Sequence, residues 1–151
     1  HHNRFLAYTH VAHDCKIGNH NTMVGNGLTG HCEVANHVTI GALSIVLPNC
    51  RLGDHCYIGA MTKIVRDVPP YMLIDGTKAY IKTYNKIGLE RHQLSEEEIQ
   101  IVEYLHSVFY TQNLTQEQAL TAIRQSDATH SVMAQNFIDF IESTKLGVYS
   151  Y

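Results

Sequence analysis

Residues 5–64 read FLAYTHVAHDCKIGNHNTMVGNGLTGHCEVANHVTIGALSIVLPNCRLGDHCYIGAMTKI and repeat with a period of six. An amphipathic helix cannot produce this period, because its apolar positions recur at three and four residues. A short fixed period instead indicates a hexapeptide β-helix, in which each hexad makes one short strand and one bend and three hexads make one coil. The apolar series that carries the period is Phe5, Val11, Ile17, Met23, Leu28, Val34, Ile40, Val46, Leu52, Ile58 and Ile64.

The step from Met23 to Leu28 is five residues instead of six, and we expect a local bulge or a tightened corner there. After Ile64 the repeat stops at Val65–Tyr71, where two prolines should terminate the stack because proline cannot continue a central strand. The predicted divisions are a β-helix over 1–71, a connecting segment over 72–90 and a helical domain over 91–151. Because the chain opens in repeat phase, we expect it to be the later part of a longer protein with earlier coils missing.

Capping signals predict three helices in the C-terminal part. Ser95 with Glu98, and Thr115 with Gln118, have the spacing of a capping box, in which two backbone amides at a helix start are satisfied reciprocally. A third helix should open at Ser131 and stop near Gly147. Apolar stripes at helical spacing follow each start and should form the core of this domain.

Composition limits the function classes. The formal net charge is −3, which argues against a nucleic-acid-binding surface. The sequence has no apolar run of transmembrane length and no signal-peptide pattern, and we therefore predict a cytoplasmic protein. All four cysteines lie two residues before a ladder residue, which favours buried thiols stacked on one face over a disulfide framework or a zinc site: Cys15, Cys32, Cys50 and Cys56.

Eleven histidines are a high count for 151 residues. Those at 20, 37 and 55 each follow a ladder residue by three and are predicted to be solvated corner residues. The segment around His10, His13 and Asp14 differs, because His31 lies about one coil after His13 and the four side chains could converge along one edge. Such a group suits general-base catalysis or a metal. The spacing alone leaves a functional cluster and scattered polar corners equally open.

Several motifs resemble the acyl-carrier-protein:UDP-N-acetylglucosamine O-acyltransferases of lipid A biosynthesis. They are the segment from His10 to Cys15, the Gly30-His31 pair, the segment from Asp67 to Tyr71, and Asn85 with Gly88–Arg91. The resemblance implies a left-handed parallel β-helix with a C-terminal α-helical domain. It also implies a homotrimer with active sites between neighbouring subunits, and acyl carrier protein as a partner.

The resemblance assigns roles residue by residue. The family's general base falls on His13, and Asp14 would orient the imidazole or stabilise its charge. No metal and no cofactor are expected, since the acyl carrier protein thioester is a co-substrate. The positions that match substrate-binding residues of the family are His10, His31, Asn85 and Arg91, the last two toward the nucleotide or its phosphates.

The implied activity is transfer of a 3-hydroxyacyl chain to the 3-position of UDP-N-acetylglucosamine, the first step of lipid A biosynthesis. The sequence departs from the family at Leu47-Pro48, where a His-Gln pair is usual, and at Ala60, Ile87 and His92. These departures leave three alternatives open: a paralogue acting on another amino sugar nucleotide, an acetyl-CoA-dependent transferase, and a non-catalytic β-helix scaffold.

Overall fold

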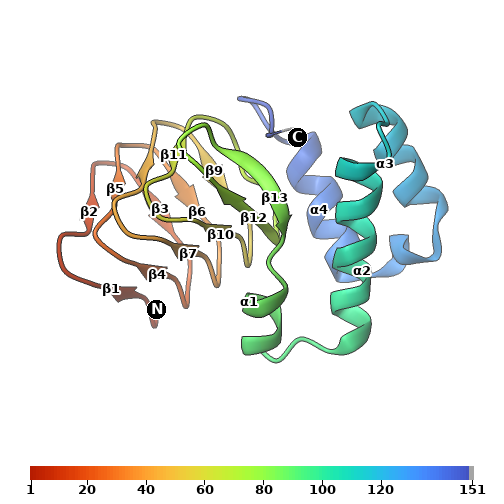
Figure 1. The fold of residues 1–151 in the computed structure, drawn as a ribbon, viewed down its shortest axis with the longest axis horizontal. Helices are drawn as coiled ribbons and strands as arrows, with labels where there is room; N and C mark the ends of the chain where they lie inside the picture. The colour runs from red at the N-terminus through yellow and green to blue at the C-terminus, as the bar shows by residue number, and fades with distance from the viewer. Residues whose placement is uncertain (150–151) are drawn as a thin grey trace.

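The computed structural model describes residues 1–149 and shows a parallel β-helix whose coils stack toward a group of helices (Figure 1). Eleven two-residue strands make up the coils, and each ends on one residue of the apolar series, as the six-residue period predicts. The strands are β1 (Arg4–Phe5), β2 (His10–Val11), β3 (Lys16–Ile17), β4 (Thr22–Met23), β5 (Gly27–Leu28), β6 (Glu33–Val34), β7 (Thr39–Ile40), β8 (Ile45–Val46), β9 (Arg51–Leu52), β10 (Tyr57–Ile58) and β11 (Lys63–Ile64).

Three parallel sheets form the sides of the coil. Sheet A contains β1, β4, β7 and β10, sheet B contains β2, β5, β8 and β11, and sheet C contains β3, β6 and β9. Strand partners lie 18 residues apart, as in the pairing of Gly27 with Ile45, but His10 pairs with Gly27 after only 17. The five-residue step is therefore a tightened corner, and the ladder on either side of it stays in register.

Residues with positive φ turn the chain at the three corners between the sheets. The corner between sheets C and A (the CA corner) has His20, His37 and His55 at φ 56–59°. At the corner between sheets A and B (the AB corner), the residues with positive φ include Gly25, Leu43 and Met61. At the corner between sheets B and C (the BC corner), they are Asp14, His31 and Asn49. Each corner residue lies above its counterpart one coil earlier, because its backbone N–H donates there, as His37 does to the carbonyl of Asn19 at 2.9 Å.

Apolar side chains of the repeat fill the interior of the coil. From Met23 onward every residue of the series is buried, and Asn21 and Asn26 fill two inward places with hydrogen-bonded side chains. The four cysteines are free thiols, as expected. Cys15, Cys32 and Cys50 precede the strands of sheet C and form one column, whereas Cys56 precedes β10 of sheet A, so a single face for all four was wrong.

The coil does not end where the repeat ends. Val68 still pairs with Leu52, and β12 (Met72–Asp75) adds to sheet A beside β10. A second strand, β13 (Tyr80–Tyr84), then runs antiparallel to β12. The expected terminator at Val65–Tyr71 therefore lies within a further coil, and the connecting segment expected over 72–90 contains both strands of a hairpin.

Helices follow the hairpin: α1 (Lys86–Arg91), α2 (Glu96–His106), the π-helix η1 (Ser107–Thr111), α3 (Gln116–Gln125), the 3₁₀-helix η2 (Asp127–His130) and α4 (Val132–Glu142). Both predicted capping boxes are present at Ser95 and Thr115, and Ser131 caps α4, which ends five residues before Gly147. Helix α1 was not expected. Within residues 1–149, no helix is long and apolar enough to cross a membrane.

Helix α4 fixes the helical part on the β-helix. Its Asn136 Nδ2 donates to Asp54 Oδ2 and to the hydroxyl of Tyr71, both at 2.9 Å. Asp54 and Tyr71 lie at the CA corner of the last coils, so the helices cover the end of the stack nearest that corner (Figure 1).

Candidate active site

The BC corner brings together three of the predicted site residues. His13 and Asp14 turn the chain from sheet B to sheet C, and Gly30 and His31 make the same turn one coil later. The backbone N–H of His31 donates to the carbonyl of His13 at 3.1 Å, which stacks the two turns. Asp14 and His31 both have positive φ at this turn, and both side chains are more than half exposed.

The His13–Asp14 hydrogen bond defines the geometry of this group. His13 Nδ1 lies 2.9 Å from Asp14 Oδ2, and His31 Nε2 lies 3.9 Å from the same oxygen. The two imidazole rings meet edge to face, with centroids 5.0 Å apart. The His13 side chain is 69% exposed, so its Nε2, on the ring edge away from the carboxylate, can meet a substrate.

Electrostatics keep the carboxylate charged. The hydrogen bond with His13, followed by the charge of His31, lowers the pKa of Asp14 below its ordinary value. An ionised carboxylate on Nδ1 fixes that nitrogen as the donor and leaves Nε2 as the basic atom. This is the arrangement that a histidine general base requires.

Gly30 forms the floor beneath the His13 ring. Its φ is +123°, and a β-carbon there would lie 3.1 Å from both Cε1 and Nε2 of His13. Any side chain would therefore push against the edge of the ring that faces substrate. The sequence analysis used Gly30 only as part of a motif and did not identify this role.

His10 lies on strand β2, three residues before the pair. Its side chain is exposed, and within residues 1–149 no hydrogen bond, ion pair or ring contact joins it to His13, Asp14 or His31. Within one chain, the imidazoles of His13 and His31 therefore come together with Asp14, and that of His10 does not join them. The substrate-binding role assigned to His10 stays a prediction.

The two residues predicted to contact the nucleotide lie elsewhere, on the outer face of sheet A. A groove of about 760 Å³ runs between that face and α1, and Asn85, Lys86, Arg91 and His92 line it. Asn85 is buried and engaged within the chain, since its Oδ1 accepts from the Gly88 N–H and its Nδ2 donates to the carbonyl of His55. Arg91 is exposed at the end of α1, and Arg4 and Lys86, also exposed, line the same groove.

The groove and the BC corner lie on opposite sides of the coil. The BC corner joins sheets B and C, and sheet A is the side of the triangular coil that faces away from it. One chain therefore holds an acid–base pair and a polar groove that do not meet. A single site containing both requires a second copy.

Comparisons with known proteins identify the family. The family model for UDP-N-acetylglucosamine O-acyltransferase, domain 2, matches residues 67–149, and a bacterial transferase hexapeptide model matches residues 31–66. This chain belongs to the UDP-N-acetylglucosamine O-acyltransferase family.

Members of the UDP-N-acetylglucosamine O-acyltransferase family match along almost the whole chain. It is 37% identical to the acyl-[acyl-carrier-protein]–UDP-N-acetylglucosamine O-acyltransferase of Leptothrix cholodnii and 36% identical to that of Halorhodospira halophila, over 97% of its length. It spans 58% and 57% of those two proteins.

Solved structures of the family give the same picture. The UDP-N-acetylglucosamine acyltransferase of Francisella novicida superposes with a TM-score of 0.92 at 27% identity, over 99% of this chain and 55% of that one. The LpxA structure from Acinetobacter baumannii gives 0.91 at 30% identity, over 98% and 58%. The predicted fold class, a left-handed parallel β-helix followed by an α-helical domain, is confirmed.

Sequence reasoning missed one group of side chains altogether. The histidines of the CA corner were expected to be solvated, but His37 and His55 are half-buried and His92 of the helical part packs against both. The spacing of His20, His37 and His55, at 17 and 18 residues, is the coil length and was the signal for stacking.

Proposed function

We propose that this chain is part of an acyltransferase that moves a 3-hydroxyacyl chain from acyl carrier protein to the 3-hydroxyl of UDP-N-acetylglucosamine, the first step of lipid A biosynthesis. The observation that carries the proposal is the exposed His13–Asp14 pair at the family's base position. Family membership supports it, as do the names of the relatives, which give acyl-[acyl-carrier-protein] as donor and UDP-N-acetylglucosamine as the acceptor of an O-acyl transfer. We assign the enzyme to the cytoplasm.

The chemistry needs one base and no cofactor. His13 Nε2 takes the proton of the sugar hydroxyl as its oxygen attacks the thioester carbonyl. The tetrahedral intermediate then collapses, the C–S bond breaks, and the imidazolium returns its proton to the departing thiolate. Asp14 stabilises the imidazolium through the 2.9 Å hydrogen bond to Nδ1. His31, on the other side of the same carboxylate, is positioned to contact substrate.

The complete site forms between two copies of the chain in a homotrimer. Support comes from the separation of the BC corner from the groove on sheet A, which a closed ring of three copies would bring together. In this arrangement His13 of one copy faces Arg91 and the groove of the next. Arg91 then binds a nucleotide phosphate through its planar guanidinium.

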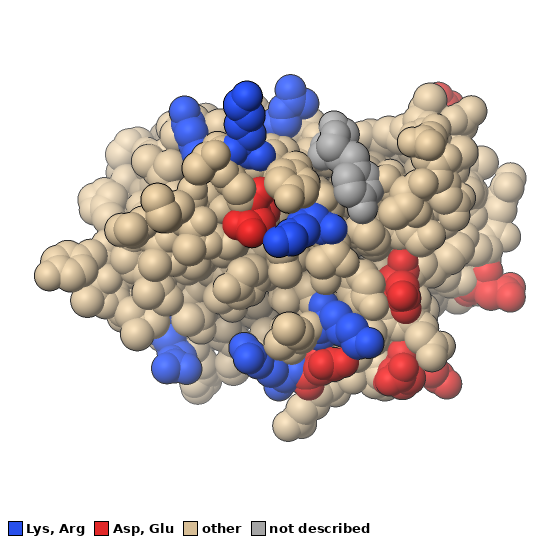
Figure 2. Space-filling view, viewed as in Figure 1, with Lys and Arg blue, Asp and Glu red and all other residues tan. Residues whose placement is uncertain are grey.

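The surface for acyl carrier protein lies near α1. Lys86 and Arg91 lie on this helix, while Lys82 on β13 is paired with Asp75 at 3.7 Å. On the face in Figure 2, Lys and Arg side chains form separate groups with acidic side chains among them. Because Lys82 is paired, the two basic residues on α1, Lys86 and Arg91, are our candidate for this contact.

The first experiment measures acyl transfer by the full-length protein. Acyl carrier proteins charged with different chains are presented with UDP-N-acetylglucosamine and, separately, its 3-amino analogue. Turnover with the hydroxyl sugar is the expected result. Turnover with the amino sugar alone would show that the acyl chain goes to nitrogen and not to oxygen. Turnover that depends on acetyl-CoA would show that the donor is not acyl carrier protein. A folded trimer that turns over none of these would overturn the proposal in favour of a scaffold.

A mixing experiment tests the two-copy site. His13→Ala and Arg91→Ala proteins should each be nearly inactive. If each site takes His13 from one copy and Arg91 from the next, equal mixing and reassembly should restore about a quarter of wild-type activity, because one interface in four then holds both intact residues. Mixed trimers that remain inactive would place both residues in the same copy's site. The matched control is reassembly of each variant alone.

A further inference from the structure

The CA corner holds a column of stacked imidazoles. The rings of His20 and His37 lie 4.9 Å apart at an interplanar angle of 7°, and those of His37 and His55 lie 4.6 Å apart at 3°. The backbone enforces this stacking, since each histidine is a corner residue whose N–H donates to the coil before. Hydrogen bonds between the residues that precede the histidines also join the coils. The backbone N–H of Asn19 donates to Asn36 Oδ1 at 2.9 Å, and that of Asn36 donates to Asp54 Oδ1 at 2.7 Å.

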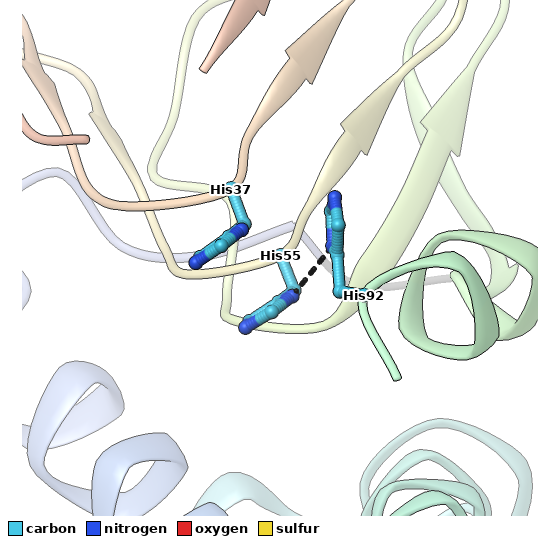
Figure 3. A group of neighbouring side chains, drawn as sticks. All are labelled: His37, His55 and His92. Atoms are coloured by element: carbon cyan, nitrogen blue, oxygen red, sulfur yellow. Dashed lines mark hydrogen bonds between the residues drawn. The ribbon is translucent and has the colours of Figure 1, made fainter. Parts of the chain in front are cut away.

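A fourth imidazole reaches the column from outside the β-helix. His92, at the C-cap of α1, lies 4.6 Å from the His37 ring and 5.1 Å from the His55 ring. His55 Nδ1 and His92 Nδ1 are 3.0 Å apart. One nitrogen of each of the three residues faces a common space, and these atoms lie within 4.8 Å of one another (Figure 3).

The hydrogen bonding of this group is incomplete. Two neutral imidazoles can share one proton between their Nδ1 atoms, which satisfies His55 and His92. The Nδ1 atom of His37 is buried and has no hydrogen-bond partner. The nearby carboxylate of Asp54 is already engaged by Asn36 and Asn136. A buried nitrogen of His37 without a hydrogen-bond partner, close to ring nitrogens of His55 and His92, suits a ligand that accepts electron pairs, such as a metal ion.

The charge state of the group fits a cation. Burial, followed by the neighbouring imidazoles, lowers the pKa of His55 to about 4 and also lowers the pKa of His37 and His92. All three are therefore neutral near pH 7. Neutral imidazole is the form that binds metals.

We propose that His37, His55 and His92 form a site for a zinc ion, with three imidazole ligands and a water as the fourth. Zinc bound tetrahedrally at about 2.0–2.1 Å places its nitrogen ligands about 3.3 Å apart. The His55 and His92 Nδ1 atoms, 3.0 Å apart, lie close to this separation. The His37 ring, which stacks at 3° on His55, must tilt to aim its nitrogen at the same ion. Imidazole ligands alone favour zinc over magnesium or calcium, which prefer oxygen.

The metal would tie the helical part to the β-helix. His37 and His55 belong to the coils, and His92 ends the helix that forms one wall of the groove with Arg91. The ion would therefore fix α1 on the CA corner and hold that wall in place. This site is separate from the BC corner, for which no metal is expected, and it does not depend on the proposed acyl transfer.

The test uses full-length protein freed of metal by a chelator. Zn²⁺ is titrated by calorimetry, and Co²⁺ is followed by its visible absorption, which reports tetrahedral nitrogen coordination. One ion per chain is expected, with affinity reduced at least tenfold in His55→Asn and in His92→Asn. Asparagine suits both positions, because it tolerates the positive φ of His55 and is compatible with the helix end at His92.

Two controls separate this site from other histidines. His20→Asn removes the next ring of the column without touching the three ligands and should bind as wild type. His13→Asn with His31→Asn removes the exposed group at the BC corner and should also bind as wild type. Absence of stoichiometric binding, binding that survives His92→Asn in folded protein, or loss of binding in the BC-corner variant would overturn the proposal.

Discussion

The BC corner and the CA corner both hold histidines and give them opposite environments. His31 shares the left-handed corner position of His37 and His55, whereas His13 directly precedes the corner residue Asp14. At the BC corner, His13 and His31 are more than half exposed and flank the carboxylate of Asp14. At the CA corner, His37 and His55 are half-buried and stacked, with no free carboxylate beside them. One arrangement supports a proton-accepting imidazole, and the other keeps imidazoles neutral with their lone pairs turned toward each other.

The difference shows that neighbours, rather than the position in the coil, decide what a corner histidine does. Asp14 directly follows His13 in the sequence, so the BC pair is set locally. The CA group depends on coil stacking and on His92, which arrives from a helix 37 residues after His55.

Removing the imidazole of His13 should have the largest effect. His13→Ala is expected to lower acyl-transfer turnover by about two to four orders of magnitude, because it removes the imidazole that Asp14 holds by a hydrogen bond at Nδ1. His20→Asn, a corner histidine of the other column, should retain activity. Full activity in His13→Ala would show that the BC corner supplies no catalytic base and so does not differ from the CA corner in this respect.

Changing the carboxylate tests the orienting role of Asp14. Asp14→Asn keeps a residue that tolerates the φ of 59° but loses the charge, and turnover should fall about 10- to 100-fold. The loss should appear in kcat more than in KM, since the imidazolium forms only during reaction. Asp14→Glu should recover part of it. Equal kcat in Asp14→Asn and wild type would leave the hydrogen bond without a catalytic role.

Crowding the His13 ring should give an intermediate effect. Gly30→Ala forces a side chain to φ +123° and places a β-carbon 3.1 Å from two ring atoms, so stability should fall by about 1–3 kcal/mol and turnover by roughly tenfold. Gly25→Ala is the matched control, because it also has positive φ but lies at the AB corner. If both variants lose stability and neither loses activity, the floor beneath His13 is not needed.

The buried cysteines should give the smallest effect, which is a difference in how fast their thiols react with a labelling reagent. Burial raises the pKa of Cys50 to about 12 and also raises those of Cys32 and Cys56, so their thiolate fraction at pH 8 is very low. Thiol labelling of native protein at pH 8 should therefore modify Cys15, which is only half-buried, well before the others. Unfolded protein should label at all four. Rapid native labelling of Cys50 would contradict its burial.

The sequence predicted those features that depend on local pattern. The six-residue series located all eleven short strands, and the capping boxes located two helix starts. The pairing of His13 with Asp14 and His31 followed from adjacency and coil length. Strand β13 lies in the segment assigned as a connection, although Tyr80–Tyr84 contains aromatic and β-branched residues that favour a strand.

What could not be predicted depends on where helices return to the β-helix. The contact of His92 with His37 and His55 requires the exact placement of α1, and the six-residue period carries no information about it. The position of the groove relative to His13 is likewise a property of the three-sided coil. Sequence periodicity thus fixes which residues stack but not which surfaces meet.

The antiparallel strand β13 has a consequence for solubility. A parallel stack presents unpaired backbone groups at its last coil, and such an edge is a template for end-to-end growth into fibres. In sheet A, β13 covers that edge with a strand of opposite direction, carrying Tyr80 and Lys82 on its exposed side, and α2 packs against it. The hairpin therefore acts as a stop against polymerisation, and the same coil that builds the BC corner can be repeated without assembling into fibrils.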